Sequence, residues 1–335
     1  MAIRVAINGF GRIGRLVLRS IIEYDRRDIE VVAINDLGPV STLAHLLQYD
    51  SVHGRFPRTV EFGADWIDVG LGKIEVTAER DPSGLPHGRL GVDIALECTG
   101  IFTARGQANA HLEAGAKRVL ISAPGEGADK TIVYKVNHDT LTREDLVVSN
   151  GSCTTNVLAP VAKVLHELFG IERGYMTTVH AYTGDQPTLD TVHKDLYRGR
   201  AAALSMIPTS TGAASAIGLV LPELKGKLHG SSIRVPTPNV SVVDLTVVAG
   251  RDVTSEEINA ALCDAAQGPM EGVLAVVTAP LVSVDLNHSP ASSNVALPQT
   301  HVVDKSLARI LTWYDNEWSF ATRMGDTALA MAKLI

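Results

Sequence analysis

Residues 3–14 read Ile-Arg-Val-Ala-Ile-Asn-Gly-Phe-Gly-Arg-Ile-Gly, a β-branched run that leads directly into the pattern G-x-G-x-x-G. An apolar pattern at helical spacing follows it. Strand, glycine turn and helix in this order are typical of a dinucleotide-binding unit, in which glycines permit a tight turn and a close approach of a pyrophosphate. The N-terminus of the helix then supplies backbone amides to the anion. We therefore predict that Gly9, Gly11 and Gly14 form a dinucleotide site.

Asp36 follows the next apolar run, residues 31–34, which we predict to be the second strand. A carboxylate at that point can accept hydrogen bonds from both hydroxyls of an adenosine ribose, and it repels a 2′-phosphate. The alternative is a strand-end residue that meets only solvent. Because the glycine pattern is intact and no arginine follows Asp36 closely, we predict NAD as the cofactor.

Strands and helices alternate through the first half of the chain, which predicts right-handed βαβ units and a parallel sheet. After about residue 150 longer β-branched runs predict a second, α+β domain. The expected strands are 3–8, 92–97, 118–121, 231–249 and 273–284, and the expected helices are 103–115, 154–169, 254–266 and 320–333. The fold class is therefore α/β, a Rossmann dinucleotide-binding domain followed by an α+β domain.

Composition excludes several classes of function. The 335 residues, 45% of them apolar, suffice for two domains. A net charge of −7 without a basic run argues against nucleic acid or an anionic membrane as a main partner. The N-terminus lacks a signal-peptide pattern and no apolar stretch reaches the length of a membrane span, so a cytoplasmic location is expected. Three cysteines are too few for a disulfide framework, and no metal site is expected.

Cys153 lies in Ser-Asn-Gly-Ser-Cys-Thr-Thr-Asn, residues 149–156, between an expected strand and an expected helix. A helix N-terminus lowers the pKa of a thiol, which would make Cys153 a nucleophile. The alternative is a small buried residue beside a Ser/Thr helix cap. His180 follows a strand-like run and enters a polar loop. Sequence spacing alone does not show whether His180 lies near Cys153.

Four longer segments identify a family. SNGSCTTN (149–156), HAYTGDQ (180–186), RVPTPNVSVVDL (234–245) and WYDNEW (313–318) resemble the signature segments of the glyceraldehyde-3-phosphate dehydrogenases. The resemblance implies an NAD-binding domain of residues 1–151 that is completed by a C-terminal helix of 318–335, and a catalytic domain of 152–317 with a mostly antiparallel sheet. It also implies a homotetramer, in which a loop of about 181–205 lies near the cofactor site of the neighbouring subunit.

The same resemblance implies a role for each matching residue. Cys153 would attack the aldehyde and His180 would take the proton, so that NAD oxidises a covalent intermediate to a thioester, from which inorganic phosphate releases 1,3-bisphosphoglycerate. The implied phosphate-binding residues are Thr183 and Arg234 for the triose phosphate, Ser152, Thr211 and Gly212 for inorganic phosphate, and Arg200 for both. Thr154 is a further implied contact of the substrate or of phosphate. The further cofactor contacts are Arg12 and Ile13 at the pyrophosphate, Arg80, Thr99 and Ser122 at the adenosine half, and Asn316 at the nicotinamide.

The sequence disfavours two other functions. An erythrose-4-phosphate dehydrogenase, which hydrolyses its thioester with water, is disfavoured because that enzyme typically lacks the equivalents of Thr183 and of Thr211-Gly212. A catalytically inactive NAD-binding protein of the same fold is disfavoured because the chain retains all four of Cys153, His180, Arg200 and Arg234.

Overall fold

The glycine-rich N-terminal segment folds as strand β1 (Ile3–Asn8), a turn and helix α1 (Arg12–Glu23) in the computed structural model, which describes residues 2–335. Strand β2 (Ile29–Asn35) then returns parallel to β1, with Ile7 opposite Ile34. The predicted order of strand, glycine turn, helix and parallel strand is confirmed.

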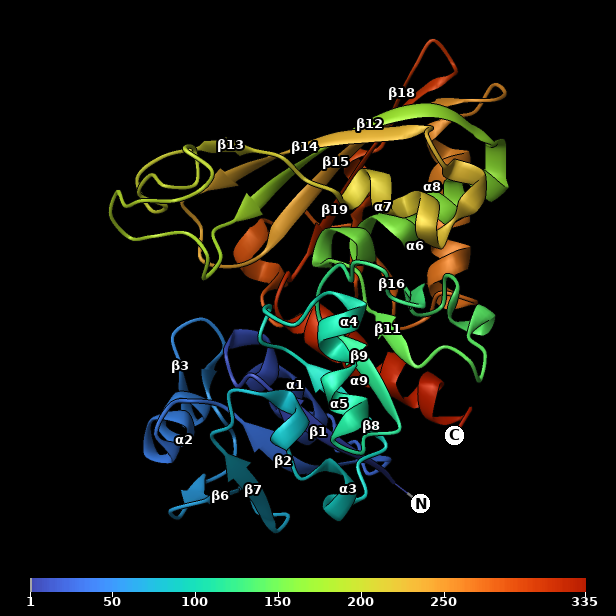
Figure 1. Ribbon diagram of the computed structural model, residues 1–335. Helices are drawn as coiled ribbons and strands as arrows, with labels where there is room; N and C mark the ends of the chain where they lie inside the picture. Colours follow the sequence, from blue (N-terminus) through green and yellow to red (C-terminus); the bar gives the residue numbers. More distant parts are fainter. Residues whose placement is uncertain (1) are drawn as a thin grey trace. The chain divides into compact units, whose positions relative to one another are not determined.

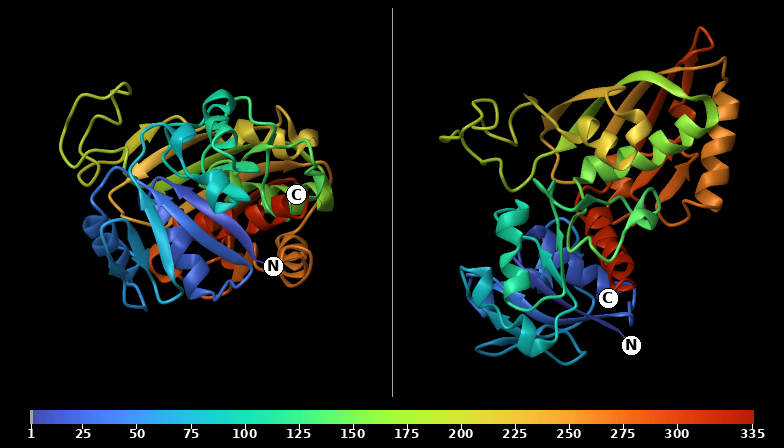
Figure 2. Two further views of the ribbon diagram at one scale, coloured as in Figure 1. Left: turned by 60° about the horizontal axis from the view of Figure 1, so that its bottom comes forward. Right: turned by 45° about the vertical axis from the view of Figure 1, so that its right-hand side comes forward.

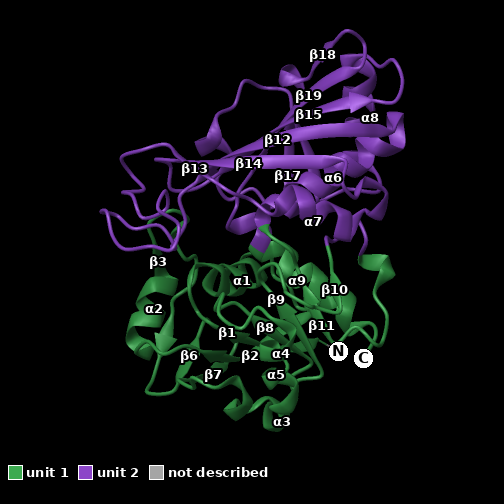
Figure 3. Cartoon of the chain, turned by 45° about the horizontal axis from the view of Figure 1, so that its top comes forward, with its two compact units in different colours: residues 1–132, 138–152, 321–335 green, residues 133–137, 153–320 purple. Residues whose placement is uncertain are grey.

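The chain divides into two units (Figure 3). Unit 1 comprises residues 1–132, 138–152 and 321–335, and unit 2 comprises residues 133–137 and 153–320. The short segment 133–137 therefore belongs to the second unit although it lies within the N-terminal half of the chain.

The sheet of unit 1 has the strand order β10-β11-β9-β8-β1-β2-β7-β6-β5. Its strands from β10 to β7 pair in parallel, and β6 and β5 extend one edge with antiparallel pairs. The remaining bounds are β5 (Glu61–Phe62), β6 (Trp66–Asp68), β7 (Lys73–Thr77), β8 (Ile94–Glu97), β9 (Arg118–Ile121), β10 (Lys130–Thr131) and β11 (Val147–Ser149), with the separate pair β3 (Tyr49–Asp50) and β4 (Gly54–Arg55). The predicted parallel sheet is confirmed.

Helices α1 to α5 lie between strands of unit 1, and the C-terminal helix α9, which belongs to this unit from Ala321 on, follows the last strand of the chain (Figure 1). Their bounds are α2 (Val40–Gln48), α3 (His87–Leu90), α4 (Arg105–Ala108), α5 (Ala110–Glu113) and α9 (Trp318–Ala332), with short 3₁₀ turns at η1 (Pro82–Gly84) and η2 (His138–Thr140). The expected single helix over 103–115 is wrong, because the chain breaks at Asn109 into α4 and α5. The C-terminal helix is tied to unit 1 by an ion pair between Arg26 and Asp326 and by a hydrogen bond from Thr327 to Asn150.

The sheet of unit 2 runs β13-β14-β12-β15-β19-β17-β16, with β18 on β19. Most of its pairs are antiparallel, and only β12 with β14 and β16 with β17 are parallel among the described residues, so the predicted sheet type is confirmed. The bounds are β12 (Ile171–Ala181), β13 (Ile207–Thr209), β14 (Leu228–Val235), β15 (Ser241–Ala249), β16 (Leu274–Val277), β17 (Ser293–Ala296), β18 (His301–Val303) and β19 (Leu307–Tyr314).

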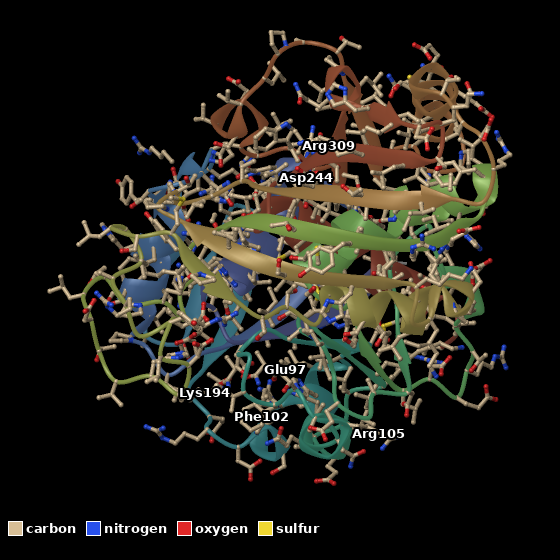
Figure 4. All side chains as sticks on the ribbon, turned by 90° about the horizontal axis from the view of Figure 1, so that it is seen from above. Glu97, Phe102, Arg105, Lys194, Asp244 and Arg309 are labelled. Atoms are coloured by element: carbon tan, nitrogen blue, oxygen red, sulfur yellow. The ribbon has the colours of Figure 1, made fainter. Side chains whose placement is uncertain are left out.

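Helices α6 (Cys153–Phe169), α7 (Ala213–Val220) and α8 (Ser255–Gln267) cover one face of this sheet (Figures 1 and 2). Their apolar residues form one core with inward-facing residues of β12, β14 and β15, such as Met176, Leu228 and Val243. On the uncovered face, Arg309 of β19 donates two hydrogen bonds of 2.8 Å to Asp244 of β15 (Figure 4). The other short elements of the unit are η3 (Pro222–Leu224), η4 (Ser283–Leu286) and η5 (Leu297–Gln299).

Residues 2–335 contain neither a membrane-spanning helix nor a cluster of metal-binding side chains. No helix there has the length and apolar character that crossing a bilayer requires. No group of three or more His, Cys, Asp or Glu side chains within that range could hold a metal ion.

Candidate active site

Cys153 and His180 come from different elements and meet in unit 2. Cys153 is the first residue of α6, and His180 is near the end of β12. The Cys153 Sγ atom lies 3.5 Å from the His180 Nε2 atom. The structure thus brings together the two side chains whose proximity the sequence left open.

The tautomer of His180 follows from its second ring nitrogen. The Nδ1 atom lies 2.6 Å from the carbonyl oxygen of Ala181. A carbonyl oxygen only accepts, so Nδ1 carries the proton and Nε2 presents a lone pair to the thiol. Burial, followed by the charge of Arg234, lowers the pKa of His180 to about 3, so the ring is neutral at physiological pH.

Burial raises the pKa of the Cys153 thiol, although the Arg234 guanidinium, the Thr154 side chain and the amides of Thr154 and Cys153 all oppose it. The lowered pKa that a helix N-terminus alone predicts is therefore wrong for the protein without its ligands, because desolvation outweighs these favourable contacts. The thiol consequently needs a base, and Nε2 of His180 is placed to be one.

Next to this pair lies a cluster of polar side chains around the Arg234 guanidinium. The Arg234 Nη1 atom donates to the carbonyl of Ala181 at 3.1 Å and to the hydroxyl of Thr183 at 2.7 Å. Its Nε atom is buried and has no hydrogen-bond acceptor among the described residues. A buried guanidinium with an unused N–H is suited to a phosphate, which offers several acceptor oxygens.

Arg198, which the sequence analysis missed, completes this group. It donates to Asp185 at 2.7 Å and to Thr209 at 2.9 Å, and Asp185 also accepts from Thr183. The charge of Arg198 also contributes to the lowered pKa of His180.

Arg200, which was expected to bind both phosphates, lies outside this group in the structure. Arg200 pairs with Asp190 at 2.8 Å, and its side chain is 66% exposed, against 25% for Arg198. The Ala201 amide donates to the same Asp190 carboxylate, so Arg200 is tied to its own loop. The sequence Arg-Gly-Arg offered two arginines, and only the conformation of the loop separates them.

The other expected phosphate residues lie at helix N-termini. Gly212 precedes α7, and the Thr211 hydroxyl accepts from the amide of Ala213 at 3.2 Å. Ser152 immediately precedes Cys153. The Thr154 hydroxyl instead turns inward and lies 3.0 Å from the hydroxyl of Tyr314, in a buried contact that the sequence did not predict.

Unit 1 contains a cavity of about 470 Å³ at the carboxyl ends of β1, β2 and β8. Of the expected cofactor residues, Gly9, Gly11, Asp36, Arg80 and Thr99 line it. Residues that the sequence analysis missed also line it, namely Asn8, Asn35, Leu37, Glu79, Cys98, Ile101 and Phe102.

Two glycines of the fingerprint are required by close contacts. Gly9 has a φ of +88°, and a Cβ there would lie 2.7 Å from the backbone nitrogen of Thr99. A Cβ on Gly14 would lie 2.1 Å from the carbonyl oxygen of Gly9. Any larger residue at these two positions would displace the turn or the helix. The turn places the N-terminus of α1 beside the cavity, where its backbone amides could bind a pyrophosphate.

The remaining expected cofactor residues do not line this cavity. Ile13 and Arg12 are in the first turn of α1, and the Arg12 guanidinium pairs with Asp50 at 2.5 Å. Ser122 follows β9. Asn316 belongs to unit 2, where its Oδ1 atom accepts from the Ser241 hydroxyl at 2.8 Å.

Comparisons with known proteins agree along the whole chain. Residues 3–105 match the family described as glyceraldehyde 3-phosphate dehydrogenase, NAD binding domain, and residues 152–316 match the corresponding C-terminal domain. The chain is 68% identical to glyceraldehyde-3-phosphate dehydrogenases of Xanthobacter flavus and Cereibacter sphaeroides, with 100% of each chain covered. It is 56% identical to that of Geobacillus stearothermophilus, with 99% of each chain covered.

Proposed function

The chain belongs to the glyceraldehyde-3-phosphate dehydrogenase family, and we propose that Cys153 and His180 carry out the covalent chemistry of that family's reaction. The reaction is the NAD-dependent phosphorylating oxidation of glyceraldehyde 3-phosphate in glycolysis. The observation that supports this assignment most strongly is the 3.5 Å contact between the Cys153 Sγ atom and the unprotonated Nε2 atom of His180.

Cys153 attacks the aldehyde carbon while its proton passes to His180 Nε2 and then to the carbonyl oxygen, which gives a thiohemiacetal. His180 next takes the hydroxyl proton as the carbon is oxidised to a thioester. Bound NAD would supply the hydride acceptor for this oxidation. Phosphate then attacks the thioester, and the bond to Cys153 breaks to release the acyl phosphate.

Two anions must be held beside Cys153 for this sequence of steps. Arg234 and Thr183 are assigned to the phosphate of the substrate, because the buried Arg234 Nε atom has a hydrogen still to donate. Thr211 and Gly212, at the start of α7, are assigned to inorganic phosphate together with Ser152. Arg198 takes the role expected of Arg200, because Arg198 contacts Asp185 and Thr209 within this group.

For the cofactor, Asp36 is assigned to the adenosine ribose and the amides at the start of α1 to the pyrophosphate. The Asp36 Oδ2 atom accepts from the Phe10 amide at 2.8 Å, which holds the carboxylate at the cavity wall. In this position its charge favours NAD over NADP.

The function predicts a requirement for phosphate. With glyceraldehyde 3-phosphate and NAD but no phosphate, the chain should form about one NADH per active site in a burst and then slow strongly, because the thioester has no nucleophile except water. Adding phosphate should restore steady turnover. NADH absorbance in a stopped-flow experiment measures both phases. A steady rate that does not depend on phosphate would instead favour hydrolysis, as in an erythrose-4-phosphate dehydrogenase.

The two neighbouring arginines give a matched pair of variants. Arg198→Ala should lower kcat/KM for glyceraldehyde 3-phosphate or phosphate by about 10- to 100-fold, since it removes charge-assisted hydrogen bonds. Arg200→Ala removes an exposed ion pair and should change kcat/KM by less than about twofold. Steady-state kinetics with each substrate varied in turn tests this. The reverse ranking would return the role to Arg200.

A homotetramer in the cytoplasm is part of the proposal. The segment of residues 182–206 projects from the sheet of unit 2 (Figure 1) and exposes a run of large apolar side chains, including a fully exposed Val192. The others are Leu189, Leu196, Tyr197, Leu204 and Met206. Such a patch is typical of a surface that is buried in an assembly. The molar mass of the protein in sedimentation equilibrium tests this, and a mass of four chains is expected.

A further inference from the structure

A row of buried polar side chains lies at the carboxyl ends of three neighbouring strands in unit 1. Glu97 ends β8, Asn8 ends β1 and Asn35 ends β2, and all three are buried. The Asn35 Nδ2 atom donates to Asn8 Oδ1 at 2.7 Å, and the Asn8 Nδ2 atom donates to Glu97 Oε2 at 2.6 Å. Asn8 and Asn35 also line the cofactor cavity, so the row forms part of its wall.

The backbone at Glu79 fixes the direction of this row. Asn35 Oδ1 accepts from the Glu79 amide at 2.8 Å, and Asn35 Nδ2 donates to the Glu79 carbonyl at 2.8 Å. A flipped Asn35 would set its NH₂ group against the Glu79 amide and its oxygen against the Glu79 carbonyl, and these backbone groups cannot exchange roles. Asn35 must therefore donate to Asn8, Asn8 must donate to residue 97, and residue 97 must accept.

Glu97 meets this requirement and also accepts hydrogen bonds from Thr99, in the loop that follows β8. Its Oε1 atom accepts from the amide of Thr99 at 2.8 Å and from the Thr99 hydroxyl. Glu97 is labelled in Figure 4. An ionised carboxylate is the common side chain that only accepts, and here each oxygen faces two donors.

His111, in α5, supplies the fourth donor. Its Nε2 atom lies 2.9 Å from Glu97 Oε2, and its Nδ1 atom lies 3.1 Å from the Nε2 atom of His87 in α3. Burial, and then the neighbouring His111, lowers the pKa of His87 to about 4, so this second ring is neutral. With His87 donating from Nε2, His111 accepts at Nδ1 and donates at Nε2 to the carboxylate.

We propose that Glu97 is a positioning residue of the NAD site, whose carboxylate sets the direction of the Glu97–Asn8–Asn35 row and so anchors both sides of the cofactor cavity. The row is fixed at one end to Glu79, which precedes Arg80, and at the other end to Thr99, which lies against Gly9. Glu97 thus acts on cofactor affinity and not on the covalent chemistry. The inference rests on the NAD site proposed above.

The isosteric variant Glu97→Gln tests the proposal. Its NH₂ group would face N–H donors whichever way it turned, so NAD binding should weaken by about 10- to 100-fold in calorimetry. At saturating NAD, kcat should stay within about threefold of the unmodified chain, and alkylation of Cys153 without NAD should be unchanged. If the variant binds NAD as tightly as the unmodified chain, the proposal is wrong.

A rescue variant separates the direction of the row from mere loss of structure. In Asn8→Asp/Glu97→Gln the acceptor moves one position along the row, so Asp at position 8 can accept from both Asn35 and the new amide, while His111 moves its proton to Nδ1. We expect most of the lost affinity to return, to within about threefold of the unmodified chain. If the double variant binds NAD as weakly as Glu97→Gln does, the direction of the hydrogen bonds in the row does not control NAD affinity and the proposal is wrong.

Two further variants control for the loss of a charge and for a failure of Glu97→Gln to fold. Glu113→Gln makes the same change at an exposed position on α5 and should leave NAD affinity unchanged. If Glu97→Gln does not fold, Thr77→Val removes only the Thr77 donor to Asn35 Oδ1, a 2.8 Å bond, and should weaken NAD about two- to fivefold. In that case, unchanged NAD affinity in Thr77→Val would contradict the proposed role of the row. An unmodified chain that failed to bind NAD would instead contradict the proposed function.

Discussion

Replacing Cys153 by serine is expected to reduce aldehyde oxidation by at least about 10⁴-fold while NAD binding stays within about twofold. A serine hydroxyl is far less acidic than a thiol and is a poorer nucleophile, so the neutral His180 could not activate it. The site would remain assembled because the hydroxyl can still contact His180 Nε2. NADH formation under single-turnover conditions and calorimetric NAD binding measure the two effects separately.

The matched control is Cys263→Ser. Cys263 is a free, partly buried cysteine in α8 of the same unit, on a different element from Cys153 and His180. The same chemical change there should leave activity within about twofold. Residual oxidation by Cys153→Ser beyond what a wild-type contaminant supplies, or a comparable loss in Cys263→Ser, would contradict the role of Cys153.

Local sequence patterns predicted the fold well where a single run of residues corresponds to a single strand or helix. The run 3–8 and the glycines after it gave β1 and the start of α1, because strand propensity and turn chemistry agree there. The expected strand 231–249 was wrong in extent, since Pro236 and Pro238 break it into β14 and β15. The expected strand 273–284 shortens to β16, which ends before Pro280.

Contacts between distant segments could not be predicted from spacing. Cys153 and His180 are brought together because α6 packs on the sheet that contains β12, which is a property of the tertiary fold. The choice between Arg198 and Arg200 depends on the path of one loop. Likewise, Asn8, Asn35 and Glu97 read as ordinary strand ends, and only the pairing of β1, β2 and β8 shows that they form one row.

Replacing His180 by asparagine is expected to lower the chemical step by about 10²- to 10⁴-fold, the usual contribution of a positioned acid-base group. The asparagine Nδ2 atom can reproduce the donation to Ala181 that His180 Nδ1 makes, and so preserve the anchor that Arg234 shares. What is lost is the acceptor at Nε2. Single-turnover NADH formation measures this loss, and exposed His229→Asn on β14 is the matched control, which should retain full activity.

The pH dependence of Cys153 alkylation tests whether His180 acts as the base for the thiol. Burial raises the pKa of the thiol, so without a base the thiolate forms only at alkaline pH, and alkylation of the His180→Asn variant by iodoacetamide should keep rising with pH through pH 9. In the unmodified chain the lone pair of His180 Nε2, 3.5 Å from the Cys153 Sγ atom, can accept the thiol proton as the sulfur attacks, so alkylation at pH 7 should be faster than in the variant. Coincident pH profiles for the two proteins would leave His180 without the role of base.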